Sequence, residues 1–397
     1  MLGIQSNSLS SCLNKQVLVS IALIVNAFVW YYSVLIPLQA NELSIWVWGI
    51  HFSGLIISAL FGASLAKRIE RSRLLIFWML LGTVSSLFLF VATVDSLLVI
   101  SIVSLLLGVS LGLGMPACMS YFTDAVDVEK RGRVSGMVIL LTGMGIFVFE
   151  IVTQVILVDS LLWGALLMVW RLFSLLLFLS VKSFRTIERK KSFGSYKDIL
   201  KQQSFLLYFI PWVMFSLINS IGTSVEPNNA FELQIIQTVF MGIFAALGGF
   251  FLDSIGRKRI TIVGFAMLGF GSAIRGLSSD AIILYINAIT AGIAGGFIFV
   301  LFIMVLWSDL SHNSASDKYY ALGVFPFFVA MLLDIAIDQY IIDIIPDPNL
   351  FSFTAFFLFL AVLPLVYAPE TLPEKNLKER ELKNYLNNAQ KIKEKYA

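Results

Sequence analysis

The chain has 397 residues, of which 58% are hydrophobic and only 13% are charged, and its net charge is +3. A water-soluble domain of this length could not bury so much apolar surface, so the composition excludes an ordinary soluble protein. In a membrane, each run of about 20 apolar residues can cross the hydrocarbon layer. Two cysteines, Cys12 and Cys118, are too few for a disulfide framework or a metal cluster. The expected fold class is therefore an all-α polytopic membrane protein.

A polar start is followed by roughly twelve apolar runs, each long enough to cross a bilayer. The first run has no small-residue cleavage pattern after it, so we expect a retained helix and not a signal peptide. The runs cover residues 16–38, 43–66, 74–94, 97–121, 134–158, 160–181, 205–225, 230–252, 260–278, 280–307, 320–342 and 350–368.

Lysine and arginine determine the expected orientation, because they concentrate in cytoplasmic loops. With the N-terminus inside, the cytoplasmic loops receive all of the loop lysines and arginines, and only Arg275 lies near an outer helix end. We therefore expect both termini in the cytoplasm.

Residues 182–204 form a charged interior segment without an apolar run. We expect it to link two six-helix halves, residues 1–181 and 205–369, with a charged cytoplasmic tail over residues 370–397. The linker is either a solvated tether or, in part, an amphipathic helix on anionic headgroups.

The loop between two of these runs, Gly249-Phe-Phe-Leu-Asp253-Ser-Ile-Gly256-Arg257-Lys258-Arg259, has an earlier counterpart at residues 63–73. The two loops are offset by about 186 residues, close to half the chain, which indicates a duplicated unit. The loop resembles the motif that joins the second and third helices of each half in the major facilitator superfamily. This resemblance implies two parallel six-helix repeats with a binding site near the bilayer midplane.

The resemblance also implies a latch at the cytoplasmic side. Asp253 would face the start of the fifth helix near Val134 and Ser135, and Arg257 would pair with Asp309. Alternatively, the basic residues of this loop serve topology alone. The gate residues implied by the two copies are Arg71, Asp124, Arg131, Gly249, Asp253, Gly256, Arg257, Lys258 and Asp309.

The first copy of the motif is incomplete, with Ala63, Lys67 and Glu70 in place of the glycine, aspartate and second glycine. Arg71 can still pair with Asp124. Lys67, however, would face the start of the eleventh helix near Lys318, where like charges repel.

Tyr121, Asp124, Arg131-Gly132 and Pro369-Glu370-Thr371 resemble patterns of the sugar-porter branch, which favours a sugar-like or other small metabolite. Amide and aromatic side chains in the apolar runs suit hydroxylated or uncharged solutes. Each could instead make an interhelical hydrogen bond. The substrate-binding candidates are Asn26, Tyr31, Tyr32, Gln154, Trp212, Asn219, Gln237 and Asn287.

Ionisable groups inside apolar runs are costly to bury and are therefore candidates for coupling. Glu150 and Arg171 lie in adjacent helices at depths within about 5 Å of each other, so we expect them to pair. This pair could serve packing alone. Asp334 is the second carboxylate that could carry a proton.

These features predict a secondary transporter of the plasma membrane that works by alternating access, with proton-coupled uptake. The chain has no Walker loop and no enzyme motif, so we expect neither ATP hydrolysis nor catalysis, and no cofactor or metal beyond the coupling proton. The expected partners are a small-molecule substrate and the lipid bilayer, with no nucleic acid, and the chain is expected to be a monomer. A drug or metabolite exporter and a non-transporting sensor on a transporter fold are the alternatives.

Overall fold

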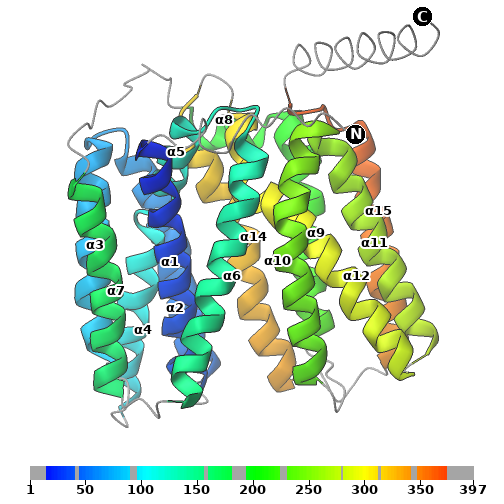
Figure 1. Ribbon diagram of the computed structural model, residues 1–397, viewed down its shortest axis with the longest axis horizontal. Coiled ribbons are helices and arrows are strands. Elements are labelled where there is room, and N and C mark those ends of the chain that lie inside the picture. Colours follow the sequence, from blue (N-terminus) through cyan, green and yellow to red (C-terminus); the bar gives the residue numbers. More distant parts are fainter. Residues whose placement is uncertain are drawn as a thin grey trace, which may run out of the picture.

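The computed structural model describes residues 15–40, 44–89, 96–155, 160–180, 194–223, 230–278, 280–311, 314–340 and 347–372. In this part of the chain, every element longer than a turn is a helix, and the long helices stand side by side (Figure 1). The expected all-α class is confirmed.

The first group of helices contains α1 (Lys15–Ala40), α2 (Ile45–Leu65), α3 (Arg71–Leu87), α4 (Leu97–Gly112), α5 (Met115–Ala125), α6 (Arg131–Val155) and α7 (Ser160–Ser180). A short helix, α8 (Tyr196–Leu200), precedes the second group. That group contains α9 (Gln203–Thr223), α10 (Ala230–Ser254), α11 (Arg257–Leu277), α12 (Ala281–Phe299), the π-helix η3 (Val300–Val305), α13 (Leu306–Leu310), α14 (Asp317–Tyr340) and α15 (Asp347–Tyr367).

Ten of these segments are long and apolar enough to cross a membrane, judged by length and composition. In that count α4 and α5 form one span, and α12, η3 and α13 form another. The helices α3, with 17 residues, and α9 stand among them, so the described residues are consistent with the twelve predicted apolar runs.

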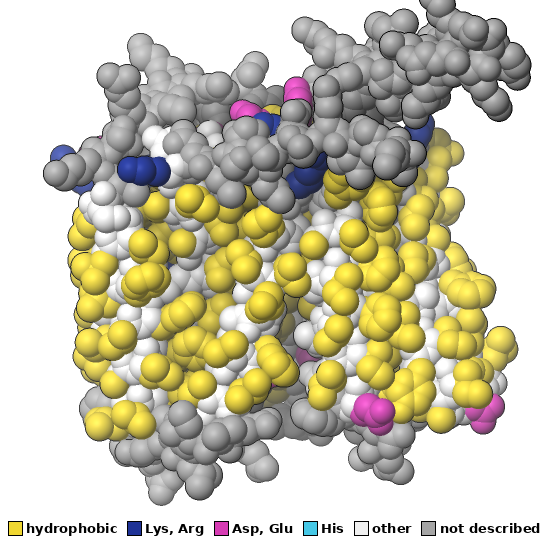
Figure 2. All heavy atoms as spheres, viewed as in Figure 1, with side chains coloured by type: hydrophobic (Ala, Val, Ile, Leu, Met, Phe, Trp, Pro, Cys, Tyr) yellow, Lys and Arg dark blue, Asp and Glu magenta, His cyan; other side chains and the backbone are white. Residues whose placement is uncertain are grey.

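The surface around the helices is a wide apolar band (Figure 2). Large side chains such as Trp46, Ile57 and Leu277 are more than half exposed on it, which is unfavourable in water and favourable in lipid. In this view lysine and arginine gather at one end of the band, with acidic side chains among them, and acidic side chains also lie at the other end. We call the first of these the basic end; α1 begins and α15 finishes there (Figure 1).

Two spans at corresponding places in the two groups are irregular. The α4–α5 span breaks at Leu113 and Gly114, just before Pro116, which has no N–H to continue the helical ladder. The α12–α13 span contains the π-helix η3, where the Tyr320 hydroxyl donates to the Met304 carbonyl (2.5 Å) and the Trp307 indole donates to the Phe302 carbonyl. These side chains satisfy carbonyls that the wider helical turn releases.

The two groups meet along α6 with α10, α2 with α14 and α5 with α14. These contacts contain the candidate functional residues described next.

Candidate functional site

A carboxylate from the second group caps a helix of the first. Asp253, at the end of α10, accepts hydrogen bonds from the backbone N–H groups of Gly132 and Arg133, both at 2.9 Å, and is fully buried. Because α6 begins at Arg131, these N–H groups belong to its first turn and carry the positive end of its dipole. The predicted cap is confirmed, but it contacts Gly132 and Arg133 rather than Val134 and Ser135.

Two glycines of the predicted motif have identifiable structural roles. Gly249 lies against Gly132 of α6, and a Cβ at either position would collide with the carbonyl oxygen of the other. Gly256 has φ of 119°, a left-handed conformation that favours glycine, and it begins α11 directly after α10 ends. The predicted close approach and tight turn are both present.

Next to the cap, two buried arginines share one carboxylate. Arg257 pairs with Asp309, as predicted, and Arg131 of the first group contacts the same carboxylate at 2.6 Å. Arg257 also lies 3.9 Å from Asp253, and its guanidinium donates to the Val128 carbonyl at 2.7 Å. Two arginines and two aspartates thus balance in charge, which a buried cluster requires. We call Arg131, Asp253, Arg257 and Asp309 the second-copy gate.

In the first copy of the motif, Arg71 pairs with a residue that the sequence analysis did not select. Arg71 pairs with Asp124 at 2.7 Å, as predicted, and also with Asp317 of α14 at 3.2 Å. The Ser120 hydroxyl donates to Asp317 at 3.1 Å and accepts from Ser316 at 2.8 Å. We call these five residues the first-copy gate.

The expectation for the start of α14 was therefore incomplete. Lys67 was expected to meet a helix start marked by Lys318, but the first residue of α14 is the buried Asp317, which pairs with Arg71. The carboxylate missing from the first loop is thus replaced by one on the opposite side of the interface. Its signal in the sequence was an acidic residue at the first position of a helix.

Another carboxylate caps α11 at the basic end. Glu370 accepts from the backbone N–H groups of Arg257 (3.0 Å) and Lys258 (3.2 Å). The Lys258 ammonium donates to the Val366 carbonyl at 2.6 Å, so the end of α15 and the start of α11 are tied together. Lys258 thus contacts its own group and not the first.

The described end of the linker contacts both groups. The Tyr196 hydroxyl donates to the Leu60 carbonyl of α2 at 2.6 Å, and Lys318 of α14 donates to the Gly194 carbonyl at 2.8 Å. Tyr319 donates to Gln202 at 2.9 Å. Residues 182–193 of the predicted linker, and the predicted tail beyond residue 372, lie outside the described residues.

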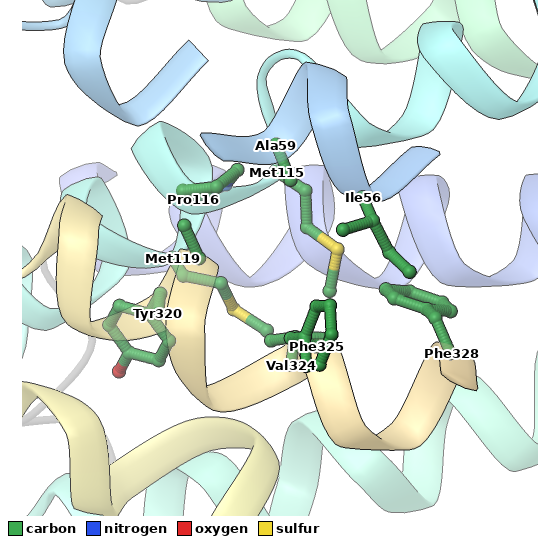
Figure 3. Close-up of a pocket in the computed structure, with 10 residues that line it drawn as sticks. Ile56, Ala59, Met115, Pro116, Met119, Tyr320, Val324, Phe325 and Phe328 are labelled. Atoms are coloured by element: carbon green, nitrogen blue, oxygen red, sulfur yellow. The ribbon is translucent and has the colours of Figure 1, made fainter. Parts of the chain in front are cut away.

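A cavity lies between the groups, lined by α2, α5 and α14, with about 300 Å³ of empty space that includes a part open to solvent. Met115 and Met119 extend from α5 toward Phe325 and Val324 of α14 (Figure 3). None of the described residues that line it is charged or carries an amide. The walls therefore suit an apolar or weakly polar surface.

Contacts close this cavity on two sides. On the basic side, two residues of the first-copy gate border the cavity. Ser120 directly follows Met119 in the sequence, and Asp317 stands one helical turn before Tyr320. Farther from the basic end, the Phe328 ring packs against Tyr31 (6.2 Å between centroids) and Phe52 (6.5 Å). The cavity between the groups is thus closed toward the basic end, and aromatic rings narrow it toward the opposite end.

Several substrate-binding candidates of the first group bond to neighbouring helices. Asn26 donates to the Trp170 carbonyl (2.6 Å) and accepts from Arg171 (3.3 Å). The Tyr31 hydroxyl lies 3.0 Å from His51 Nε2, and His51 Nδ1 lies 2.8 Å from the Ser104 carbonyl. For Asn26 and Tyr31, interhelical bonding describes the structure better than a free binding group.

The predicted Glu150–Arg171 pair is not formed. In the described part of the chain, the guanidinium of Arg171 lies 4.1 Å from the Trp78 ring and 5.2 Å from the Trp30 ring, with Asn26 as its hydrogen-bond partner. Tyr32 instead donates to Glu150 at 3.2 Å. Similar depth did not produce a pair, because Arg171 turns into the bundle beneath Gly82, where a side chain would collide with it.

The candidate residues of the second group also do not gather at one site. Trp212 is buried, donates to the Gly323 carbonyl at 2.7 Å and stacks on Phe302 at 4.8 Å. Gln237 and Asn287 line a different cavity, inside the second group, and Asp334 is half-buried on α14. The side chains of Gln154 and Asn219 lie outside the described residues.

Comparison with known proteins identifies one family and one fold. Residues 18–227, that is 210 of the 397 residues, match the family model described as the Major Facilitator Superfamily. No curated protein sequence matches the chain. The structure is similar to that of the major facilitator superfamily proton:xylose symporter XylE bound to 6-bromo-6-deoxy-D-glucose, with a TM-score of 0.68 and 16% identity. That match covers 91% of this chain and 97% of XylE, and at this identity it concerns the fold alone.

Proposed function

Because the chain belongs to the major facilitator superfamily, we propose that it is a secondary transporter that carries a small solute across the membrane by alternating access. One observation carries the proposal: Asp253 and Arg131 join the two helix groups at the basic end, and Arg71 does so within a turn of the cavity between the groups. Breaking these contacts would open the cavity toward the basic end.

The moving bodies in this proposal are residues 1–181 and 205–369. Residues 182–204 connect them, and residues 370–397 form a tail on the same side. Ion pairs suit this motion because each can exchange its protein partner for water when the basic end opens. The cycle needs no ATP and no catalytic residue, and the bilayer and a monomer suffice. We assign the basic end to the cytoplasm and the protein to the plasma membrane.

We infer that the solute is small and uncharged. XylE, whose fold is similar, is a proton:xylose symporter, which supports a sugar-like solute. Methionine and phenylalanine walls in the cavity between the groups favour a solute with an apolar face over a charged metabolite. A pyranose meets both conditions, because its ring presents an apolar face and its edge presents hydroxyl groups.

For coupling, we propose that a proton enters with the solute and that Glu150 or Asp334 carries it. Glu150 is the better candidate because the Tyr32 hydroxyl donates to it at 3.2 Å, so a group that can exchange protons lies beside this carboxylate.

Proteoliposomes test this proposal directly. Uptake of radiolabelled xylose and of a panel of neutral sugars is measured with and without an inward proton gradient. We expect saturable uptake of one solute class that a protonophore reduces. Uptake unaffected by protonophore and pH would refute the coupling, and no movement of any solute in either direction would favour a sensor.

Export of an apolar compound is the second candidate function, favoured by the mostly apolar walls of the cavity in Figure 3. It predicts proton-driven efflux of a hydrophobic dye from inside-out vesicles, with no sugar uptake in the assay above.

A further inference from the structure

A second cavity is lined only by the second helix group among the described residues. Residues of α9, α10, α11, α12 and α15 line it, with about 590 Å³ of empty space that includes a part open to solvent. It shares no lining residue with the cavity between the groups, which is built from α2, α5 and α14. Transport through the interface between the groups therefore does not explain it.

The second cavity lies toward the end of the molecule opposite the basic end. Asn287 stands six residues after the start of α12, Ser272 five residues before the end of α11, and Thr354 seven residues after the start of α15. At 1.5 Å per residue, these side chains lie about 8–11 Å from that end. In Figure 1 these helix ends lie on the side away from the start of α1.

One polar group in the wall of this cavity has unused hydrogen-bonding capacity. The Thr354 hydroxyl is buried, with 5% of the side chain exposed, and has no hydrogen-bond partner among the described residues. Gln237, Ser272 and Asn287 also line the cavity. Because buried hydroxyls are usually paired, the Thr354 hydroxyl in this wall is available to bond a molecule in the cavity.

Glycine and aromatic residues shape the remaining wall. A Cβ on Gly271 would come within 3.1 Å of the Asn287 amide oxygen and 3.3 Å of the Thr290 hydroxyl, so glycine leaves the space beside this amide free. Phe215 and Phe351 provide flat apolar surfaces, and the Arg275 guanidinium lies 4.3 Å from the Phe351 ring centre. The wall thus combines apolar faces with amides and hydroxyls.

We propose that this cavity is a binding site for a small uncharged molecule that carries hydroxyl groups and an apolar face. Its amides and hydroxyls both donate and accept, which matches hydroxyl groups on a ligand. The described residues lining it include no charged side chain, so an ion would lose its hydration without compensation. The site is separate from the transport cavity, and its occupancy does not depend on the proposed transport.

Binding of phenyl β-D-glucopyranoside tests the proposal, because this probe joins a hydroxylated ring to an apolar one. The full chain is reconstituted in lipid nanodiscs, and binding of the radiolabelled probe is measured at equilibrium without any gradient. We expect saturable binding that Thr354→Val and Asn287→Leu each weaken about tenfold, as loss of one buried hydrogen bond predicts. Phenyl phosphate, which has the same ring and a charge, should not compete.

Two matched controls separate this site from alternatives. Thr142 on α6 also has a buried hydroxyl without a described partner but lines neither cavity, so Thr142→Val should leave binding unchanged. Val324→Phe fills the cavity between the groups and should block transport but not probe binding. Ser272→Ala is a milder variant at the proposed site and should also weaken binding if Asn287→Leu fails to fold.

Three results would overturn the proposal. These are no saturable binding to the unaltered protein, binding that Thr354→Val and Ser272→Ala leave unchanged, or binding that Val324→Phe abolishes. Because binding is measured without transport, a protein that binds the probe but moves no solute would contradict the proposed function and leave this site intact.

Discussion

The cap of α6 by Asp253 allows a quantitative prediction about the gate. Asp253→Asn retains the shape of the side chain and one acceptor oxygen. It replaces the second oxygen, which accepts from a backbone N–H at 2.9 Å, with an NH₂ group that faces that donor. It also removes one negative charge from the second-copy gate, leaving two arginines with one aspartate.

The expected size of the effect follows from these losses. A hydrogen bond to a charged group contributes about 1.5–3 kcal/mol, and a carboxylate at a helix N-terminus contributes about 0.3–1 kcal/mol more. We take about 3 kcal/mol as the stabilisation of the closed state that Asp253→Asn removes. At about 1.4 kcal/mol per factor of ten, the ratio of closed to open molecules falls about 100-fold.

Spin-label distances across the basic end measure this ratio. Glu129, before α6, and Arg259, on α11, are exposed at that end and belong to different groups. Labels on cysteines at these positions, in a Cys12→Ser background that retains the buried Cys118, should show one short distance in the parent and a major longer distance in Asp253→Asn. Asp127→Asn, which removes an exposed charge at the same end, is the control.

An unchanged distance distribution in Asp253→Asn would show that the cap does not hold the gate. The same broadening in Asp127→Asn would show that net charge, and not the cap, is responsible. Either result would refute the reasoning from the geometry of the second-copy gate.

Four further predictions concern other contacts. Asp317→Asn should shift the equilibrium between closed and open molecules toward the open form by about 2 kcal/mol in the same spin-label assay, because Arg71 and Ser120 both lose an ionised partner. An unchanged distance distribution would mean that Asp124 alone holds Arg71. Asp309→Asn should destabilise the protein by about 3–5 kcal/mol in thermal unfolding in detergent, because two buried arginines lose their shared carboxylate; a loss below that of Asp127→Asn would contradict this. Glu370→Gln should lower the free energy of unfolding by about 1 kcal/mol, because it weakens the cap of α11. Glu70→Gln, at an exposed position, is the control, and equal losses of stability in the two variants would show that the cap contributes nothing. Glu150→Gln should abolish proton-driven accumulation in proteoliposomes while solute exchange persists; retained accumulation would eliminate Glu150 as the proton carrier.

The sequence predicted the latch residues well because they belong to a local motif. Asp253, Gly256 and Arg257 stand within five positions at a helix boundary, and such a loop has few geometries that leave no N–H group unpaired. Their partners were implied by the resemblance to the major facilitator superfamily motif. The cap was displaced by two positions because α6 begins at Arg131, and an apolar run does not locate the first helical turn.

The polar residues inside the spans were predicted poorly. Depth along a helix can be counted from the sequence, but the direction in which a side chain points also depends on how the helix is rotated against its neighbours. Glu150 and Arg171 matched in depth and not in direction, so Arg171 lies against Trp78 and Trp30. Asn287 and Gln237 were taken as candidates for a site between the halves and instead face a cavity inside one of them.

The amino-acid sequence by itself determined the all-α membrane class and predicted the succession of apolar segments and their orientation. These depend on how each segment partitions between water and lipid, which is a property of composition and charge along the chain. The tertiary structure alone decided that Asp317 completes the first-copy gate, that the cavity between the groups is apolar and that a second cavity contains an unpaired hydroxyl. Those features arise from helices far apart in the chain, whose packing depends on side-chain shape at each contact and not on any local pattern.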